Sequence, residues 1–102
     1  MKVIDFYDIH RHDQYSLFDG FGNADQVAEY AKELGYKAVG STNHGNITGL
    51  IQHYKACEKN GINPILGCEF YFQPKIDKEK KTYHLCLYAS NMEGWKNLNR
   101  LI

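Results

Sequence analysis

The stretch Asp8-Ile9-His10-Arg11-His12-Asp13 places two histidines, separated by a single residue, near the start of a 102-residue chain. Residues 2–10 are apolar and aromatic enough to predict a strand that leads into this pair. Because side chains alternate across a strand, both imidazoles would lie on the same face. Imidazoles together with carboxylates are common ligands of zinc, manganese and iron, and such a cation can activate a water molecule for hydrolysis. The first hypothesis is therefore a metal-dependent, phosphoesterase-like site.

Side chains of the same two kinds recur along the rest of the chain, at Asp19, His44, Glu69 and His84. Each has a simpler interpretation. The paired histidines could bond to backbone groups at a strand end, and Asp19 could be a turn residue before Gly20. His44 could cap the helix that follows it, and Glu69 could be a solvated charge at a strand end. The joint occurrence of these residues is what favours a shared site.

The composition limits the class of protein. A hydrophobic content of 43% and an aromatic content of 14% in 102 residues are typical of a single globular domain. Twelve Lys and Arg balance twelve Asp and Glu, so no broad basic surface is expected, and any DNA contact would be local or supplied by other sequence. Three widely spaced cysteines without a CxxC pair indicate reduced thiols. With no signal core or membrane span in the sequence, we expect a cytoplasmic protein without membrane partners.

Helices and strands are predicted to alternate along the chain. The predicted strands are residues 2–10, 37–42, 62–72 and 82–89, and the predicted helices run from Asn23 to Gly35, over 50–60 and onward from Asn91. Asn23 and Gln26 have the spacing of a capping box. Such alternation predicts an α/β fold with a mainly parallel sheet. The charged segment 75–81 contains no predicted helix, so the last two strands could instead be antiparallel. Four strands cannot close a barrel.

Several side chains receive a non-catalytic interpretation. The inward helix faces are predicted to be Val27, Ala31 and Leu34, then Leu50, Ile51, Tyr54 and Cys57, and finally Trp95, Leu98 and Ile102. His53 lies outside every motif and is predicted to be a surface or boundary residue. Cys68 and Cys86 are predicted to be small buried hydrophobes, and residues 70–72 to be packed strand aromatics rather than a base-stacking surface. Asp13 is left out of the site.

Five motifs in order resemble one known family. They are His10-Arg11-His12, Tyr15-Ser16-Leu17-Phe18-Asp19-Gly20, Ser41-Thr42-Asn43-His44-Gly45-Asn46, Pro64-Ile65-Leu66-Gly67-Cys68-Glu69 and Tyr83-His84-Leu85. Together they resemble the polymerase and histidinol phosphatase (PHP) domain that begins bacterial-type DNA polymerase III alpha subunits. The resemblance covers essentially the whole chain. It implies a distorted (β/α)7 barrel, of which this chain would form a partial barrel with about four strands and three helices.

The resemblance also implies a set of metal ligands. Matched position by position, these are His10, His12, Asp19, His44, Glu69 and His84, which would bind Zn, Mn or Fe at the barrel mouth. Where the family usually has Asp before the third histidine, this chain has Asn43, a neutral amide that can still hydrogen-bond. Residues 1–102 would be the N-terminal part of the domain, because the sequence ends before the family's later ligands. The metal site would then be incomplete.

Three functions remain open from the sequence. The chain could be the N-terminal fragment of a replicative DNA-directed DNA polymerase, a nucleotidyltransferase, with part of a 3′-5′ exonuclease-like phosphoesterase site. In that case it would meet DNA through the full-length polymerase, with the rest of that chain or other replisome subunits as partners, and would be inactive or weakly active alone. Alternatively it could be a non-catalytic platform that packs on the polymerase body. A free-standing phosphatase is the weaker alternative, because the motif flanks resemble polymerases.

Overall fold

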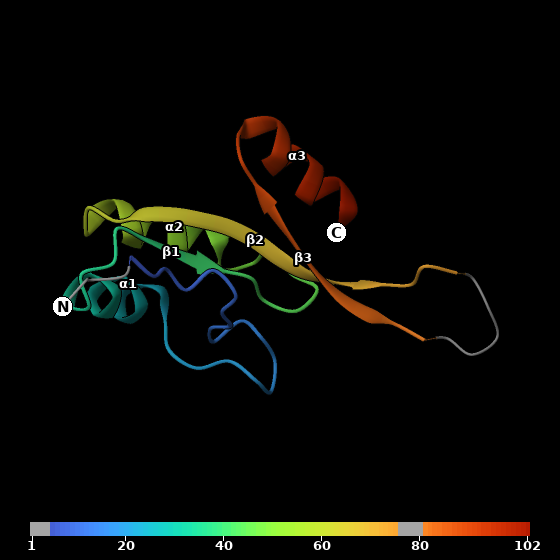
Figure 1. Ribbon diagram of the computed structural model, residues 1–102, viewed down its shortest axis with the longest axis horizontal. Helices are drawn as coiled ribbons and strands as arrows, with labels where there is room; N and C mark the ends of the chain where they lie inside the picture. The colour runs from blue at the N-terminus through green and yellow to red at the C-terminus, as the bar shows by residue number, and fades with distance from the viewer. Residues whose placement is uncertain (1–4, 76–80) are drawn as a thin grey trace.

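A computed structural model describes residues 5–75 and 81–102 of the chain (Figure 1). In these ranges it contains three helices and three strands, in the order α1 (Ala24–Glu33), β1 (Ala38–Ser41), α2 (Leu50–Lys59), β2 (Asn63–Phe72), β3 (Tyr83–Ala89) and α3 (Met92–Leu101). The fold is α/β, as predicted from the alternation of elements. None of the described helices is long and apolar enough to cross a membrane.

The strands form one sheet in the order β1-β2-β3. β1 and β2 are parallel, while β2 and β3 form a long antiparallel pair that projects away from the helices in Figure 1. The antiparallel alternative for the last two strands is therefore the correct one. The predicted loop at 75–81 lies largely outside the described residues, since 76–80 are not described.

The strand predicted over residues 2–10 is not present in its described part, residues 5–10, which is irregular backbone. The segment nevertheless runs beside β1, because the Gly40 N–H donates to Asp8 O at 2.7 Å and the Thr42 N–H to Arg11 O at 2.8 Å. A Cβ at Gly40 would lie 2.6 Å from Ile9 O, so glycine is what permits this close crossing. Two isolated contacts do not make a ladder, and the sheet therefore has three strands rather than four.

The hydrophobic core lies between α1, α2 and the sheet. Its buried members are Ala24, Ala28, Ala31, Val39, Ala56, Cys57 and Ile62. The capping box at the start of α1 is confirmed, because the Gln26 N–H donates to Asn23 Oδ1 and the Asn23 N–H to Gln26 Oε1. Of the predicted face, Ala31 is buried and Val27 is partly buried against the core, whereas Leu34, the C-cap of α1, is half exposed. The buried face of α1 consists of alanines. Small side chains on this face let α1 pack closely against α2.

The other two helices also bury narrower faces than predicted. In α2, Leu50 and Cys57 are buried as predicted, whereas Ile51 and Tyr54 are about half exposed. In α3, Leu98 is buried but Ile102 is exposed. The sequence pattern predicted wider faces because it could not show that few elements are available to cover them.

His53 is not the surface or boundary residue that was predicted. It is fully buried in α2, and its Nε2 donates to Val39 O at 3.0 Å. Burial lowers its pKa below the ordinary value and outweighs the opposing effect of that hydrogen bond. His53 is therefore a neutral core residue that ties α2 to β1.

Two smaller expectations are settled by burial. Cys68 is fully buried as predicted, and Cys86 is only partly so. The aromatic segment 70–72 belongs to β2 and pairs with β3, as the prediction of strand aromatics requires, but Tyr71 is 61% exposed and Phe72 about half exposed, so these two rings are not packed.

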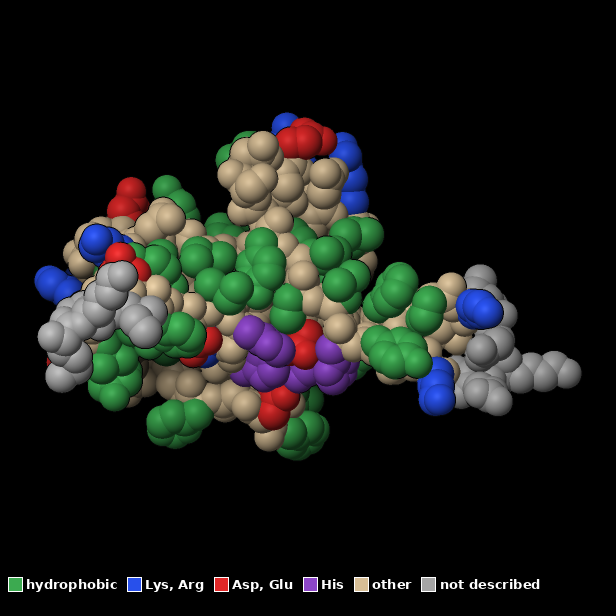
Figure 2. All heavy atoms as spheres, viewed as in Figure 1, with side chains coloured by type: hydrophobic (Ala, Val, Ile, Leu, Met, Phe, Trp, Pro, Cys, Tyr) green, Lys and Arg blue, Asp and Glu red, His purple; other side chains and the backbone are tan. Residues whose placement is uncertain are grey.

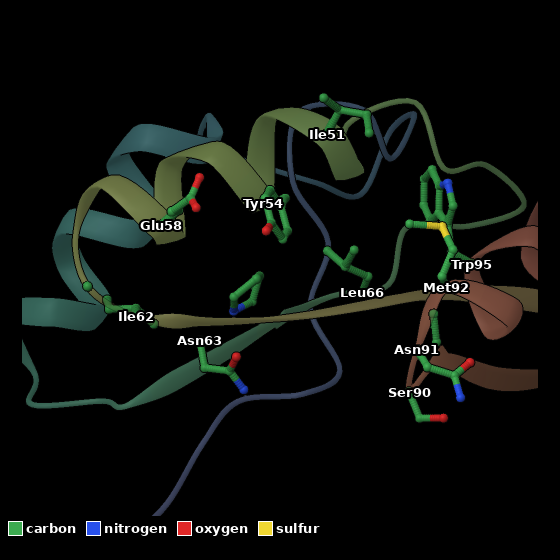
Figure 3. Close-up of a pocket in the computed structure, with 13 residues that line it drawn as sticks. Ile51, Tyr54, Glu58, Ile62, Asn63, Leu66, Ser90, Asn91, Met92 and Trp95 are labelled. Atoms are coloured by element: carbon green, nitrogen blue, oxygen red, sulfur yellow. The ribbon is translucent and has the colours of Figure 1, made fainter.

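An apolar groove of about 770 Å³ separates α2 from α3 over the outer face of β2 (Figure 3). Ile51 and Tyr54 line it from the α2 side, Leu66 lines it from β2, and Met92 and Trp95 from α3. The half-exposed side chains of α2 are thus exposed to this groove rather than to a flat surface.

Candidate metal centre

The N-terminal segment presents both of its histidines to the end of the sheet. Arg11, between them, anchors the backbone: its N–H donates to Thr42 Oγ1 at 3.0 Å, and its guanidinium donates to Gly40 O and His12 O. Because the segment is extended here, residues on either side of Arg11 project to the same side. The irregular backbone therefore achieves what the predicted strand would have achieved for the histidine pair.

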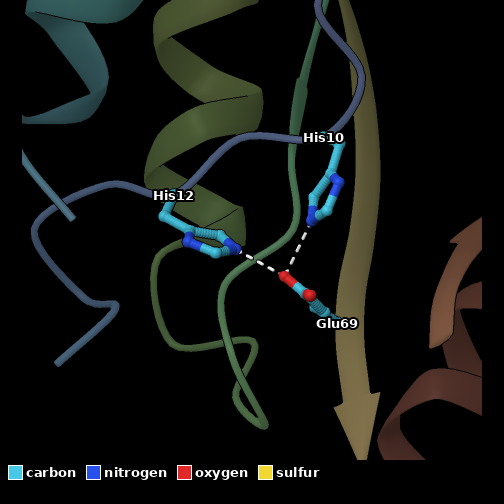
Figure 4. Close-up of side chains that lie close together, drawn as sticks. All are labelled: His10, His12 and Glu69. Carbon is cyan, nitrogen blue, oxygen red and sulfur yellow. Dashed lines mark hydrogen bonds and ion pairs between the residues drawn. The ribbon is translucent and has the colours of Figure 1, made fainter. Parts of the chain in front are cut away.

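Glu69 is the point at which the two histidines meet (Figure 4). Its Oε2 lies 2.8 Å from His10 Nε2 and 2.6 Å from His12 Nε2. The side chain is 3% exposed, so Glu69 is not the solvated strand-end charge that was its simpler interpretation. A buried carboxylate requires charged or hydrogen-bonding partners, and imidazoles supply them here.

His44 is placed beside Glu69 by the backbone. The two residues form an isolated parallel bridge beyond the end of β1, with the Glu69 N–H donating to Asn43 O and the Gly45 N–H to Glu69 O, both at 3.0 Å. His44 Nδ1 lies 3.7 Å from Glu69 Oε2. His44 does not cap α2, whose N-cap is Gly49.

Asp19 joins the cluster from the turn after the N-terminal segment. Its Oδ2 lies 2.8 Å from His44 Nε2 and 3.3 Å from His12 Nδ1. Ser16, which sequence reasoning did not single out, donates its hydroxyl to Asp19 Oδ1 at 2.6 Å and is itself buried. Its position three residues before Asp19, within the same motif, was the available signal. Asp19 is thus both a turn residue and part of the cluster.

His84 reaches the cluster through the antiparallel pairing of β2 and β3. It lies directly opposite Tyr71 in register, and Tyr71 shares a face with Glu69 two residues earlier. His84 Nδ1 consequently lies 3.2 Å from Glu69 Oε1. Its position early in the last strand was hard to reconcile with a parallel sheet, and the antiparallel register explains it.

The structure thus brings all six predicted residues together. They form three overlapping triads: His10 with His12 and Glu69, His12 with Asp19 and His44, and His44 with Glu69 and His84. In each triad the candidate ligand atoms lie within 4.8 Å of one another. Figure 2 shows the histidines as one continuous patch with acidic side chains set into it.

The donor set fits a divalent cation. The Nε2 atoms of two imidazoles converge on the same Glu69 oxygen. In addition, His44 Nδ1 is buried and has no hydrogen-bond partner among the described residues. A lone pair buried without a partner is costly in a folded chain. Nitrogen and carboxylate donors that face one point in this way suit zinc, manganese or iron.

The electrostatics of the cluster favour charged carboxylates. Burial raises the pKa of Glu69, but the hydrogen bonds from His10 and His12 and the nearby histidines outweigh it, so the pKa lies below the ordinary value. The Ser16 hydroxyl is the main cause of the lowered pKa of Asp19, assisted by His12 and His44. Both side chains are therefore in the anionic form that binds cations.

Asp13, which sequence reasoning left out, organises the support beneath the cluster. It is 1% exposed, and its Oδ1 accepts from Asn43 Nδ2 at 2.7 Å and from the Tyr15 N–H at 2.9 Å. In return the Asp13 N–H donates to Asn43 Oδ1 at 2.9 Å. Asp13 Oδ2 also accepts from Ser41 Oγ at 3.3 Å and lies 3.8 Å from the Arg11 guanidinium.

The Asn43 side chain therefore contacts Asp13 rather than any of the six clustered residues. Its backbone carbonyl is what positions Glu69. The carboxylate that faces the neutral amide at position 43 is that of Asp13, across a reciprocal hydrogen-bonded pair. Adjacency to His12 was the only sequence signal for this role.

A search of protein families matches residues 8–102 to the PHP domain. Among curated proteins, the chain is 42% identical over 109 residues to the DNA polymerase III subunit alpha of Aquifex aeolicus, a match that covers 95% of this chain and 9% of that protein. The subunit of the same name from Helicobacter pylori is 42% identical over 97 residues, covering 91% of this chain and 8% of the relative. The chain thus spans less than a tenth of the length of these relatives.

Two solved structures are also similar. A protein described as a metal-dependent phosphoesterase from Bifidobacterium adolescentis matches with a TM-score of 0.68 and 26% identity, over 92% of this chain and 32% of that one. An amidohydrolase from Chromobacterium violaceum matches with a TM-score of 0.67 and 21% identity, over the same shares, and supports the fold alone. The chain corresponds to about a third of each, as expected for a partial barrel.

Proposed function

The chain belongs to the PHP domain family, and from this we propose that residues 1–102 are the N-terminal part of such a domain in a bacterial-type DNA polymerase III alpha subunit. We propose further that the clustered residues bind divalent metal for the hydrolysis of a phosphodiester at a DNA 3′ end. The relatives named as that subunit, at 37–42% identity over about 90% of the chain, support the first part. The convergence of four imidazoles and two carboxylates supports the second.

In the proposed site, some residues would bind the cations and others would position those ligands. His10 with His12 and Glu69, His12 with Asp19 and His44, and His44 with Glu69 and His84 are three overlapping groups that could each hold a cation. Because a neutral imidazole has one lone pair, His12 and His44 would each serve one cation at a time. A cation bound there would lower the pKa of a coordinated water and offset charge on the phosphodiester. Ser16 fixes the orientation of Asp19, and the Asp13–Asn43 pair fixes the backbone that carries Glu69. We name no side chain as general base.

The same proposal implies which partners the chain would have and where it would act. The chain would meet DNA through the full-length polymerase, and its partners would be the rest of that polymerase and other replisome subunits. As part of a bacterial polymerase, it would act in the cytoplasm. The 102-residue chain has no net charge, so it offers little long-range attraction for DNA on its own. Its turnover in isolation is therefore expected to be weak.

Hydrolysis by the metal-loaded chain tests this proposal. The chain is loaded with Mn²⁺ or Zn²⁺ and incubated with a 3′-mismatched primer–template and, separately, with a small aryl phosphomonoester. Loss of the 3′ nucleotide that disappears in His10→Ala/His12→Ala and persists in His53→Gln supports the proposal. Turnover of the phosphomonoester alone would instead favour a free-standing phosphatase.

A specific observation favours a second candidate, the non-catalytic platform. The apolar groove between α2 and α3 (Figure 3) leaves Trp95, Met92 and Ile51 partly exposed to solvent. Apolar surface of this kind is typical of interaction sites. If the chain binds a purified remainder of the polymerase tightly, but neither binds metal nor hydrolyses the primer, the platform becomes the better explanation.

A further inference from the structure

A fully exposed phenylalanine stands at the edge of the metal cluster. Phe18 is 99% exposed, and its φ of 70° makes it the one residue other than glycine with a positive φ in the described part of the chain. Left-handed backbone is strongly disfavoured for a bulky side chain. The chain therefore bears both strain and an unburied aromatic ring immediately before Asp19. Hydrogen bonds from the Asp19 and Gly20 N–H groups to Ser16 O close the turn around Phe18, but the ring itself is left uncovered.

A second exposed aromatic ring, that of Tyr71, is fixed against the cluster. The ring is 61% exposed and lies nearly parallel to the His44 imidazole, with an interplanar angle of 15° and 6.0 Å between centroids. The His84 ring meets it edge-on at 5.4 Å. Gly45 also approaches it closely, because a Cβ there would lie 3.3 Å from Tyr71 Cε2. These neighbours hold the ring in place and leave much of its surface accessible.

The two rings border one hollow of about 430 Å³, a volume within the range of ligand pockets. It is lined by Leu17, Phe18, Asp19, His44, Asn46, Tyr71 and His84. Three of these are candidate metal ligands, and two are exposed aromatics. In Figure 2, hydrophobic side chains border the histidine patch. The hollow thus combines a place for a phosphate with a place for a flat apolar group.

We propose that Phe18 and Tyr71 form a stacking rim that holds the terminal nucleobase of a single-stranded DNA end while the adjoining phosphate lies at the metal cluster. This inference rests on the proposed function and adds the residues that select a nucleotide over a small phosphomonoester. Bases stack on aromatic side chains regardless of sequence, each stack being worth roughly 5- to 100-fold in affinity.

The balanced charge of the chain gives such a rim a role in binding. Nucleic-acid binders usually gain most of their affinity from Lys and Arg that neutralise phosphates. Here basic and acidic residues balance at twelve each, and none of the described residues that line the hollow is Lys or Arg. Within this chain, affinity for a DNA end would come from bound cations and from stacking. A base that stacks on the rim would also be the one attached to the phosphate next to Asp19 and His44.

The test measures binding without turnover. The probe is a short oligodeoxynucleotide with 2-aminopurine as the 3′-terminal base and a phosphorothioate at the last linkage, added to the zinc-loaded chain. Stacking quenches 2-aminopurine fluorescence, and anisotropy of a 5′ label reports affinity. We expect quenching with wild type, and 5- to 100-fold weaker binding without quenching in Phe18→Ala and in Tyr71→Ala. Phe18→Trp and Tyr71→Phe, which keep a ring, should bind within about twofold of wild type.

Phe21→Ala is the matched control, because Phe21 is 93% exposed in the same loop but does not line the hollow. Its affinity should remain unchanged. An oligonucleotide with an abasic 3′ terminus should bind wild type weakly and should be insensitive to Phe18→Ala. The rim is refuted if Phe18→Ala weakens the abasic and base-bearing probes equally, as a protein-contact or folding role would, or if it weakens neither.

Zinc binding, measured on the same samples, distinguishes failure of the stacking rim from failure of the proposed function on which it rests. If wild type and the aromatic variants bind zinc alike and the variants lose no affinity for the probe, the stacking rim fails and the metal site stands. If wild type binds neither zinc nor manganese, the proposed function fails and the rim with it. If zinc-loaded wild type does not bind the probe, the rim alone is refuted.

Discussion

Asn43→Asp would place a second carboxylate against Asp13 in a part of the structure that excludes solvent. Asn43 and Asp13 are each 1% exposed, and Asn43 Nδ2 donates to Asp13 Oδ1 at 2.7 Å. The substitution changes one NH2 group to an oxygen and leaves the shape of the side chain almost the same. A donor–acceptor contact becomes an acceptor–acceptor contact. It therefore tests whether the charge of Asp13 and the amide of Asn43 are complementary.

The magnitude follows from two competing costs. Two charged carboxylates at the present 2.7 Å separation would repel by about 6 kcal/mol at an effective dielectric constant of about 20. Protonating one of them instead costs about 4 kcal/mol at pH 7, because its pKa must rise from about 3.9 to about 7 at about 1.36 kcal/mol per unit. One of the two carboxyl groups should therefore take up a proton, because protonation costs less than repulsion. Arg11, 3.8 Å from Asp13 Oδ2, offsets part of the cost, so we expect a loss of about 3 to 4 kcal/mol at pH 7.

The loss should depend on pH with a defined sign. The shared proton raises one carboxyl pKa in the folded state above its unfolded value of about 3.9. A raised folded-state pKa stabilises below the unfolded pKa, and this contribution is lost as pH rises through the folded pKa. Relative to wild type, Asn43→Asp should therefore be nearly as stable at pH 4 and progressively less stable toward pH 7. The pair titrates as a unit, so only this trend is assigned to it.

Urea unfolding followed by Trp95 fluorescence and by circular dichroism measures the effect, beginning at pH 4.5, where the variant is folded. Asn97→Asp is the control, since the same substitution on an exposed face of α3 should change stability by no more than about 0.5 kcal/mol. The exchange Asp13→Asn/Asn43→Asp should recover most of the loss. A loss below about 1 kcal/mol at pH 7, or an exchange variant no better than Asn43→Asp alone, would refute the reasoning.

Two further outcomes follow from buried groups of the core. Burial lowers the pKa of His53, so its contribution to stability should be complete above about pH 6.5 and should be lost as pH falls below that value. Urea unfolding midpoints measured between pH 5 and 7 should therefore rise with pH in wild type and rise less steeply in His53→Gln. Equal slopes in the two proteins would contradict this expectation. Burial raises the pKa of Cys57 to about 11, so an aromatic disulfide reagent should modify this thiol only on unfolding. If some thiol of the folded protein is modified quickly, that fast phase of modification should disappear in Cys86→Ser. Its disappearance in Cys57→Ser would contradict the expectation.

The sequence predicted the elements that local signals specify. The capping box at Asn23, the cap at Asn91 and the apolar periods fixed the positions of all three helices, and alternation in residues 82–89 placed His84 on the correct face. Burial was less predictable. His53, Ile51 and Ile102 were misjudged because a helix sequence shows which residues are apolar but not which neighbours are present to cover them.

The candidate site likewise contains residues that could be predicted from the sequence and residues that could not. The six clustered residues could be predicted because motif spacing and chemistry both point to them. Asp13 and Ser16 could not, since their roles arise from partners that only the fold brings near: Asp13 meets Asn43 thirty residues later in the chain. The first strand was predicted from composition, but two hydrogen bonds to the β1 region position its backbone without a ladder. Exposed Tyr71 was taken for a packed residue for a similar reason, because β-propensity describes the strand and not its surroundings.

Calorimetric titration of the chelator-treated chain with Zn²⁺ and Mn²⁺ tests most directly whether the clustered residues form a metal centre. Wild type and His53→Gln should bind at least one equivalent of one of these ions. Glu69→Gln, which removes the charge shared by two of the three triads, should bind at least about 100-fold more weakly, as should His10→Ala/His12→Ala. Unchanged affinity in Glu69→Gln, or the absence of binding in folded wild type, would contradict the account.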